Sequence, residues 1–235
     1  RCLVGSEMCI RDSCRKNHVS KILYAQSFGD IKNYAEKDIL LKPDMKPDFS
    51  YNTDHTIYVM TKNFTVDMIK NYNQMYGISA FIFRLPTIYL YSKTDTYFVD
   101  GEERKIGYRL LIDNAIEGKD IEIWGDKTRK KDMVYVKDFC QMMYKALISD
   151  RKFGHYNVGT GVGTSLEKQI EGIIDVFSDG VHKSKIIERK DKPNSPQYIM
   201  DIQNAKDELG YEPKYNYIEM LKDLKREMNE KRFDC

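Results

Sequence analysis

Ala80-Phe81-Ile82-Phe83-Arg84-Leu85, followed by Pro86, is the stretch that decides the fold. A nearly continuous apolar run is typical of a strand buried on both faces of a parallel sheet, and the proline ends it. A second apolar run, Lys21 to Gln26, ends at Ser27. Between the two runs, Tyr58 to Gly77 has helical periodicity and no internal Pro or Gly. Strand, helix and strand in this order predict a right-handed parallel unit.

The alternation of helices and strands continues along the chain. The patterns predict helices at residues 108–116, 138–147, 164–177, 203–209 and 217–228, and strands at residues 121–124, 133–136 and 155–158. Asp138 is expected to cap the second of these helices, and Thr164 with Glu167 the third. The sequence therefore predicts an α/β fold. Because ligands lie at the carboxyl ends of parallel strands, Ser27 and Thr87 mark the expected site.

Tyr58 and Lys62 are four residues apart, which places them one turn apart on one helix face. A neighbouring cation stabilises a phenolate. A Tyr that acts as a base near neutrality needs its pKa lowered from ~10 by roughly three units, about 4 kcal/mol. On spacing alone, the favoured interpretation is an amphipathic helix with a half-buried Tyr and a solvated Lys. Tyr89 and Lys93 have the same spacing, but they lie in a segment of loop composition.

Composition limits the classes of function. The 235 residues include 38 basic and 36 acidic residues, interspersed and with a net charge of +2, which argues against nucleic acid as a partner. No apolar stretch approaches the ~18 residues of a membrane span, and no signal peptide is recognisable. The five cysteines have no C-x-x-C spacing, so neither a metal site nor a disulfide framework is favoured. A reducing cytoplasm is the expected location.

Two segments need separate interpretation. Residues 1–13 have no clear period and resemble translated adapter sequence, so they are expected to be non-native, with a native irregular segment as the alternative. The glycine-rich segment Gly159 to Gly163 lies between a predicted strand and a predicted helix, which is the setting of phosphate loops. Its G-x-G-x-G spacing matches neither the dinucleotide fingerprint nor the P-loop. A tight structural turn is therefore the favoured interpretation, with phosphate binding as the alternative.

Seven motifs stand in a familiar order along the chain. They are Lys21-Ile22-Leu23-Tyr24-Ala25-Gln26-Ser27; Tyr58-x-x-x-Lys62; Phe83-Arg84-Leu85-Pro86-Thr87-Ile88-Tyr89; Trp124-Gly125-Asp126; Lys131-Asp132-Met133-Val134-Tyr135-Val136-Lys137-Asp138; Tyr156-Asn157-Val158-Gly159-Thr160-Gly161; and Asp201-Ile202 through Leu209-Gly210-Tyr211-Glu212-Pro213. Together they resemble the NAD-dependent epimerase/dehydratase family, the extended short-chain dehydrogenases that act on nucleotide sugars. The resemblance covers residues 14 to about 230.

The resemblance implies a Rossmann-type, doubly wound parallel sheet. Residues 14–90 would form the carboxyl-terminal part of the NAD(P)-binding domain. Residues 91–235 would form a smaller α/β substrate-binding lobe, interleaved with the sheet near residues 155–178. The first strands, the Gly-rich turn and the acidic ribose residue of the family have no counterpart in the sequence. We therefore expect an N-terminally truncated fragment that binds dinucleotide poorly and is inactive as given.

The resemblance also implies the catalytic residues. Tyr58 would take the proton from a sugar hydroxyl, and Ser27 would hydrogen-bond the reacting oxygen. Lys62 would lower the pKa of Tyr58 and hold the ribose of the cofactor, which would be NAD or NADP. Pro86 and Thr87 match family positions beside the nicotinamide.

The substrate implied by the resemblance is a nucleotide-diphosphate sugar. Lys131 and Lys192 stand where the family commonly has Arg residues that bind the substrate diphosphate, although each is also explained as a solvated surface charge. The 4,6-dehydratases have Asp-Glu directly after the catalytic Ser or Thr, whereas Phe28-Gly29 follows Ser27 here. Epimerisation is therefore the expected reaction. A 4-ketoreductase and a non-catalytic sugar-nucleotide binding module remain alternatives, and homodimerisation is left open.

Overall fold

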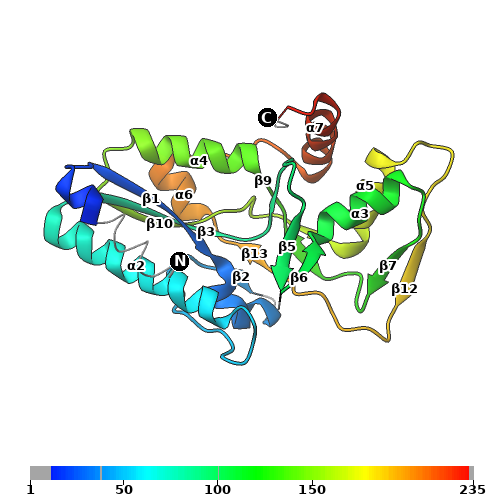
Figure 1. Ribbon diagram of the computed structural model, residues 1–235, viewed down its shortest axis with the longest axis horizontal. Coiled ribbons are helices and arrows are strands. Elements are labelled where there is room, and N and C mark those ends of the chain that lie inside the picture. Colours follow the sequence, from blue (N-terminus) through cyan, green and yellow to red (C-terminus); the bar gives the residue numbers. More distant parts are fainter. Residues whose placement is uncertain (1–11, 38, 100, 233–235) are drawn as a thin grey trace.

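A parallel sheet of three strands organises one half of the molecule (Figure 1). The computed structural model describes residues 12–37, 39–99 and 101–232. The sheet has the order β1 (Lys21–Ser27), β3 (Ser79–Leu85) and β10 (Phe153–Asn157). Ser27 pairs with Leu85 in this register, so the last residues of β1 and β3 meet at the carboxyl edge of the sheet.

Helices cover both faces of the sheet (Figure 1). On one face α2 (Thr56–Tyr76) contacts β1 and β3. On the other face α4 (Val136–Ile148) contacts β1, and α6 (Gln203–Leu209) contacts β10. Apolar side chains fill both layers, because the central strand β3 is buried on its two sides. The predicted doubly wound parallel sheet is confirmed.

The second half of the molecule packs three helices with short strands. Helix α5 (Leu166–Phe177) contacts both α3 (Gly107–Ile116) and α7 (Tyr217–Glu230). The strands of this half and of the junction form two-stranded pairs. These are β2 (Leu40–Leu41) with β13 (Ile199–Met200), β4 (Ile88–Tyr89) with β9 (Val134–Tyr135), β5 (Thr96–Val99) with β6 (Glu102–Lys105), β7 (Ile121–Trp124) with β12 (Ile186–Arg189), and β8 (Lys130–Asp132) with β11 (Gly163–Ser165).

Some helix and strand boundaries differ from those predicted. The single strand expected at residues 133–136 is replaced by β8 and β9, and Val136 already begins α4. Asp138 does not cap α4, because its carboxylate accepts the backbone N–H groups of Lys214 at 2.8 Å and Tyr215 at 3.3 Å. These long-range partners satisfy a side chain that the sequence assigned to a local role.

The cap of α5 also differs by one residue. Ser165, not Thr164, accepts the backbone N–H of Lys168 at 3.3 Å and is the N-cap of the helix. Thr164 belongs to β11 instead, where it pairs with Lys131. Strand pairing therefore takes precedence over the local capping pattern at this position.

The remaining expectations about organisation are outside what the structure tests. Residues 1–13, predicted to be non-native, lie outside the described residues except for residues 12 and 13. The division of the chain into two domains at residue 90 stays a prediction.

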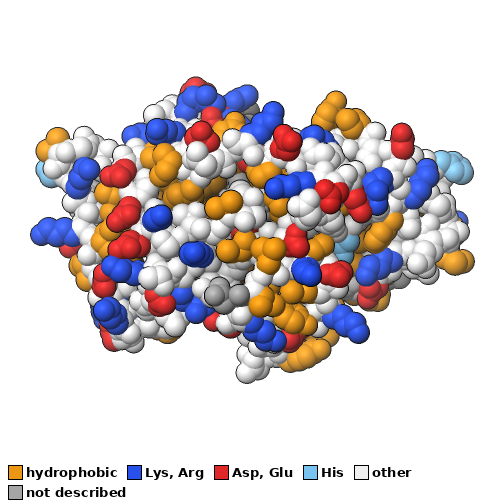
Figure 2. All heavy atoms as spheres, turned by 180° about the vertical axis from the view of Figure 1, so that it is seen from behind, with side chains coloured by type: hydrophobic (Ala, Val, Ile, Leu, Met, Phe, Trp, Pro, Cys, Tyr) orange, Lys and Arg blue, Asp and Glu red, His pale blue; other side chains and the backbone are white. Residues whose placement is uncertain are grey.

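None of the described helices is long and apolar enough to cross a bilayer. Basic and acidic side chains are interspersed on the rear face (Figure 2).

Candidate active site

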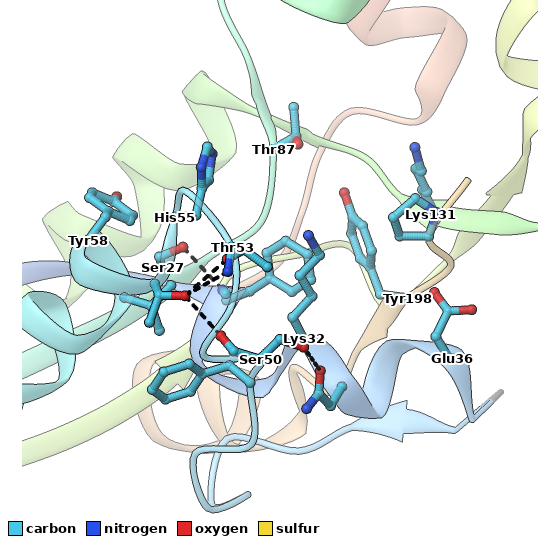
Figure 3. Close-up of a pocket in the computed structure, with 17 residues that line it drawn as sticks. Ser27, Lys32, Glu36, Ser50, Thr53, His55, Tyr58, Thr87, Lys131 and Tyr198 are labelled. Carbon is cyan, nitrogen blue, oxygen red and sulfur yellow. Dashed lines mark hydrogen bonds between the residues drawn. The ribbon is translucent and has the colours of Figure 1, made fainter. Parts of the chain in front are cut away.

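The carboxyl ends of β1 and β3 border a cavity of about 460 Å³, which we call the catalytic cavity (Figure 3). Ser27 from β1 and Tyr58 from the first turn of α2 line one side. Thr87, two residues after the end of β3, and Lys131 from β8 line another. The structure therefore brings together four of the predicted site residues from four separate segments.

Ser27 is held by the start of the short helix η1 (Phe28–Glu36). Its hydroxyl caps η1 by accepting the backbone N–H of Gly29 at 3.1 Å. The same hydroxyl also acts on Tyr58, because its interaction with the phenol lowers the pKa of Tyr58. Gly29 is required here by close packing, since a Cβ at this position would lie 2.9 Å from Cγ2 of Val59 and 3.2 Å from Oγ of Ser27. The glycine thus allows β1 and α2 to approach each other beside the two hydroxyls.

Tyr58 and Lys62 lie one turn apart on α2, as predicted, but the ammonium does not lower the pKa of the phenol. Lys62 Nζ donates to the carbonyl oxygen of Ala25 at 3.0 Å and lies 5.7 Å from the ring centroid of Tyr58. Burial raises the pKa of Tyr58, and the Ser27 hydroxyl partly opposes this shift. The direction is opposite to the one expected from the sequence, because the lysine faces the ring and a backbone carbonyl.

The opposite wall of the cavity is built around a buried carboxylate. Asp132 follows Lys131 and is fully buried. It accepts the backbone N–H groups of Thr160 at 2.8 Å, Gly161 at 3.0 Å and Met200 at 3.2 Å. The glycine-rich loop therefore donates its N–H groups to the protein's own carboxylate, which agrees with the structural turn predicted for it.

A second cavity, of about 730 Å³, adjoins the first. We call it the outer cavity. Thr87, Lys131 and Tyr198 line both cavities, so these residues mark the junction. Trp124 lines only the outer cavity, and its indole Nε1 donates to Glu122 at 2.8 Å. Only these three of the described residues line both cavities, and through them the catalytic cavity adjoins the outer cavity.

Three predicted site residues lie outside the linings of both cavities: Lys62, described above, Pro86 and Lys192. Pro86 is buried directly before Thr87. Lys192 lies above the ring of Trp124, with its Nζ 5.5 Å from the ring centroid, and is not part of either lining. Lys131 is therefore separated from the second lysine that was expected to share its ligand.

Sequence reasoning missed most of the residues that line the catalytic cavity. They include Lys32 on η1, His55 at the N-cap of α2, and Tyr198 before β13. None of these three residues belongs to a recognisable motif, and each reaches the cavity through tertiary packing. Only His55 could have been found from the sequence, because it lies three residues before Tyr58 and therefore on the same side of α2.

The sequence of this chain matches a known family. Residues 4–159 match the family described as "NAD dependent epimerase/dehydratase family". The chain belongs to this family. The resemblance inferred from the seven motifs is thereby confirmed, and NAD is the cofactor named in the family's description.

Curated relatives of this epimerase/dehydratase chain are distant in sequence. A dTDP-4-dehydro-6-deoxyglucose reductase of Escherichia coli is 27% identical over 221 residues, which are 89% of this chain and 62% of the relative. Two proteins of Methanocaldococcus jannaschii are 27% and 25% identical over 222 and 219 residues. These alignments cover 94% and 91% of this chain but only 66% and 60% of the two relatives.

Solved structures of the family share the fold. The UDP-N-acetylglucosamine 4-epimerase of Bacillus cereus superposes with a TM-score of 0.77 at 19% identity, over 95% of this chain and 68% of that one. The UDP-glucose 4-epimerase of Thermotoga maritima, solved with UDP-glucose, gives 0.76 at 20% identity, over 95% and 69%. At these identities the likeness establishes the Rossmann-type fold.

The donor set beside Tyr58 fits the nicotinamide half of a dinucleotide. The Lys62 ammonium carries three N–H donors, of which one is directed at the carbonyl of Ala25. The others suit ribose hydroxyls. The loop from Gly159 to Gly163 does not fit the pyrophosphate, because Asp132 already accepts its N–H groups. Among the described residues, no group of three or more His, Cys, Asp and Glu side chains could hold a metal ion.

Proposed function

We propose that this chain carries the catalytic and substrate-binding part of an NAD-dependent nucleotide-sugar epimerase. One observation supports this more than any other. Ser27 and Tyr58 line the same cavity at the carboxyl edge of the sheet, and the Ser27 hydroxyl lowers the pKa of the Tyr58 phenol against the effect of burial. Lys62 stands one turn further along α2. A base, a hydroxyl donor and a cation are the groups that oxidation of a sugar hydroxyl requires.

Each of these residues has a distinct role in the proposed reaction. Tyr58 takes the proton from the sugar hydroxyl, and Ser27 donates a hydrogen bond to the reacting oxygen. Lys62, together with Pro86 and Thr87, holds the nicotinamide riboside half of the cofactor. NAD, when bound, supplies the hydride acceptor.

The two adjoining cavities support a substrate that has a sugar at one end and a nucleoside at the other. The sugar would occupy the catalytic cavity beside Tyr58. The nucleoside would occupy the outer cavity, whose lining includes Trp124 and Tyr108. The diphosphate would cross the junction at Lys131, the lysine shared by both linings. Lys192, above Trp124, would then contact the nucleoside end instead of the diphosphate.

A 4-ketoreductase is the second candidate, and the pKa of Tyr58 favours it. Burial keeps the phenol protonated at higher pH, which suits donation of a proton to a ketone. The E. coli relative is named as a reductase of a 4-keto sugar. Dehydration is disfavoured, because packing against Val59 leaves no room for an acidic side chain at Gly29.

Replacement of Tyr58 by Phe tests the proposal. In a complete protein that binds NAD, we expect the interconversion of UDP-glucose and UDP-galactose to fall by about 10²–10⁴-fold. Tyr76→Phe is the matched control, because Tyr76 lies on the same helix and is similarly exposed (51% against 46%). Unchanged turnover in Tyr58→Phe would contradict the assigned role.

The unmodified chain separates the remaining candidates. Consumption of reduced cofactor with a 4-keto sugar, without interconversion, would replace the epimerase by the reductase. Binding of both UDP-glucose and NAD without either reaction would leave a non-catalytic binding module.

A further inference from the structure

The catalytic cavity has an excess of positive charge. Two lysines line it, Lys32 and Lys131, together with one carboxylate, Glu36. Glu36 is already paired, since Arg129 Nη2 lies 2.6 Å from its Oε2. Within the part of the chain that the structure describes, neither lysine forms an ion pair. His55, the remaining ionisable side chain of the lining besides the tyrosines, contacts Asp54 at 3.1 Å.

Lys32 leaves the backbone at a fixed point. On one side of it, Asp30 is buried against Arg84. On the other side, Asn33 donates through its side chain to Asp48 Oδ1 at 2.8 Å and through its backbone to the Asp48 carbonyl at 3.1 Å. The side chain itself is exposed and points into the cavity (Figure 3). A lysine anchored on both sides and free at its tip is suited to binding a ligand.

Lys131 enters from the opposite wall, and its backbone is equally fixed. It forms a parallel bridge with Tyr198 and precedes the buried Asp132. In Figure 3, Lys32 and Lys131 lie on either side of Tyr198. Burial lowers the pKa of Lys131, and repulsion by Arg129 adds to the shift. An anion placed between the two ammonium groups would stabilise both charges.

We propose that Lys32 is a substrate-binding residue that forms, with Lys131, a two-cation clamp on the diphosphate. This inference rests on the proposed nucleotide-sugar substrate. Lys32 lines only the catalytic cavity, whereas Lys131 lines both. Lys32 therefore contacts the phosphate nearest the sugar, and Lys131 sits at the centre of the diphosphate. The clamp replaces the pair of Lys131 and Lys192 expected from the sequence.

Calorimetric titration with UDP and UMP tests the clamp without any turnover. We expect Lys32→Gln to weaken UDP binding about tenfold and to leave UMP binding within about twofold, because UMP lacks the phosphate that Lys32 contacts. Lys131→Gln should weaken both ligands. Lys46→Gln is the matched control, since Lys46 is an exposed lysine of the same half outside both cavities.

Each outcome is decisive. Unchanged UDP affinity in Lys32→Gln, with normal binding by the unmodified chain, overturns the clamp alone. Equal losses for UDP and UMP also overturn it, because Lys32 would then not distinguish the second phosphate. Failure of the unmodified chain to bind UDP or dTDP overturns both the clamp and the proposed substrate. Loss of the Tyr58 role in the turnover assay leaves the clamp standing.

Discussion

Arg84 and Asp30 form a buried, two-point ion pair that joins β3 to η1. Arg84 Nε donates to Oδ1 of Asp30 at 3.0 Å, and Nη2 donates to Oδ2 at 2.9 Å. Both side chains are at most 2% exposed. Burial raises the pKa of Asp30, and the guanidinium opposes that shift. Because η1 begins directly after Ser27, this pair fixes the segment that leads from the Ser27 hydroxyl to Lys32.

Removal of the Asp30 carboxylate should strongly destabilise the fold. In Asp30→Ala the Arg84 guanidinium stays buried without its counter-charge, and we expect a loss of about 3–5 kcal/mol in the free energy of unfolding. Urea unfolding measures it. Asp67→Ala is the control, because Asp67 is 77% exposed and 3.6 Å from Lys70, so a change within about 0.5 kcal/mol is expected. Equal losses in the two variants would refute the structural role of the pair.

Gly29→Ala tests the close packing beside the two hydroxyls. The added methyl group would lie 2.9 Å from Cγ2 of Val59, and we expect a loss of about 1–3 kcal/mol from overpacking. Val59→Ala removes the opposing atom, so the double variant should be more stable than the sum of the single changes predicts. Simple additivity in this double-mutant cycle, measured by urea unfolding, would rule out the contact.

His155 should make stability dependent on acid pH. Gln26 Nε2 donates to Asp30 and Asn63, so its Oε1 accepts a hydrogen bond from His155 Nε2 at 2.9 Å. The pKa of His155 is lowered from the ordinary 6.5 to about 3, mainly by burial. The unfolded chain therefore binds a proton that the folded chain rejects between these values. Stability is fully present above pH 6.5 and is lost as the pH falls towards 3.

The free energy of unfolding at pH 7 and pH 4.5 measures this dependence. His155→Gln should reduce the difference between the two values, because glutamine does not titrate. His18→Asn is the control, since His18 is exposed and has a left-handed backbone that Asn tolerates. An identical pH dependence in His155→Gln and the unmodified chain would show that His155 is not the titrating group.

Tyr198 should make stability dependent on alkaline pH. Burial raises its pKa to about 12, although a hydrogen bond with Thr87 opposes the shift. An unfolded Tyr titrates near ~10. The contribution of Tyr198 to the free energy of unfolding is therefore complete below about pH 10, and up to about 2 kcal/mol of it is lost as the pH rises towards 12. Tyr198→Phe should therefore lose less stability than the unmodified chain between pH 8 and pH 11.5. Parallel losses in urea unfolding would contradict the shift.

The sheet and the catalytic face of α2 could be predicted because their signals are local. The run Ala80 to Leu85 is apolar on both sides and becomes the central strand. Periodicity placed Tyr58 and Lys62 on one face, and Gly77 ends α2 with a left-handed backbone of φ 69°. Thr87 reaches the cavity because it follows the carboxyl end of a strand. Each of these features depends on residues close together in the chain.

Features that depend on distant residues could not be predicted. Lys32 faces the cavity because Arg84, 54 positions after Asp30, fixes the start of η1, and because Ile31 bends that helix with φ −119°. Lys192 lies over Trp124 because β12 pairs with β7. The direction of the Tyr58 pKa shift was also wrong, since spacing gives the position of Lys62 but not the carbonyl to which it donates.

Asp132 makes the order of synthesis relevant to the site. Its carboxylate is held by Thr160, Gly161 and Met200, which follow it by 28, 29 and 68 positions. Ser27 and Tyr58 emerge from the ribosome long before these partners, and domains form as their segments become available. The wall that carries Lys131 can therefore close only when β13 has been translated. A nascent chain that stops earlier would present the two hydroxyls on a surface that still lacks its opposite side.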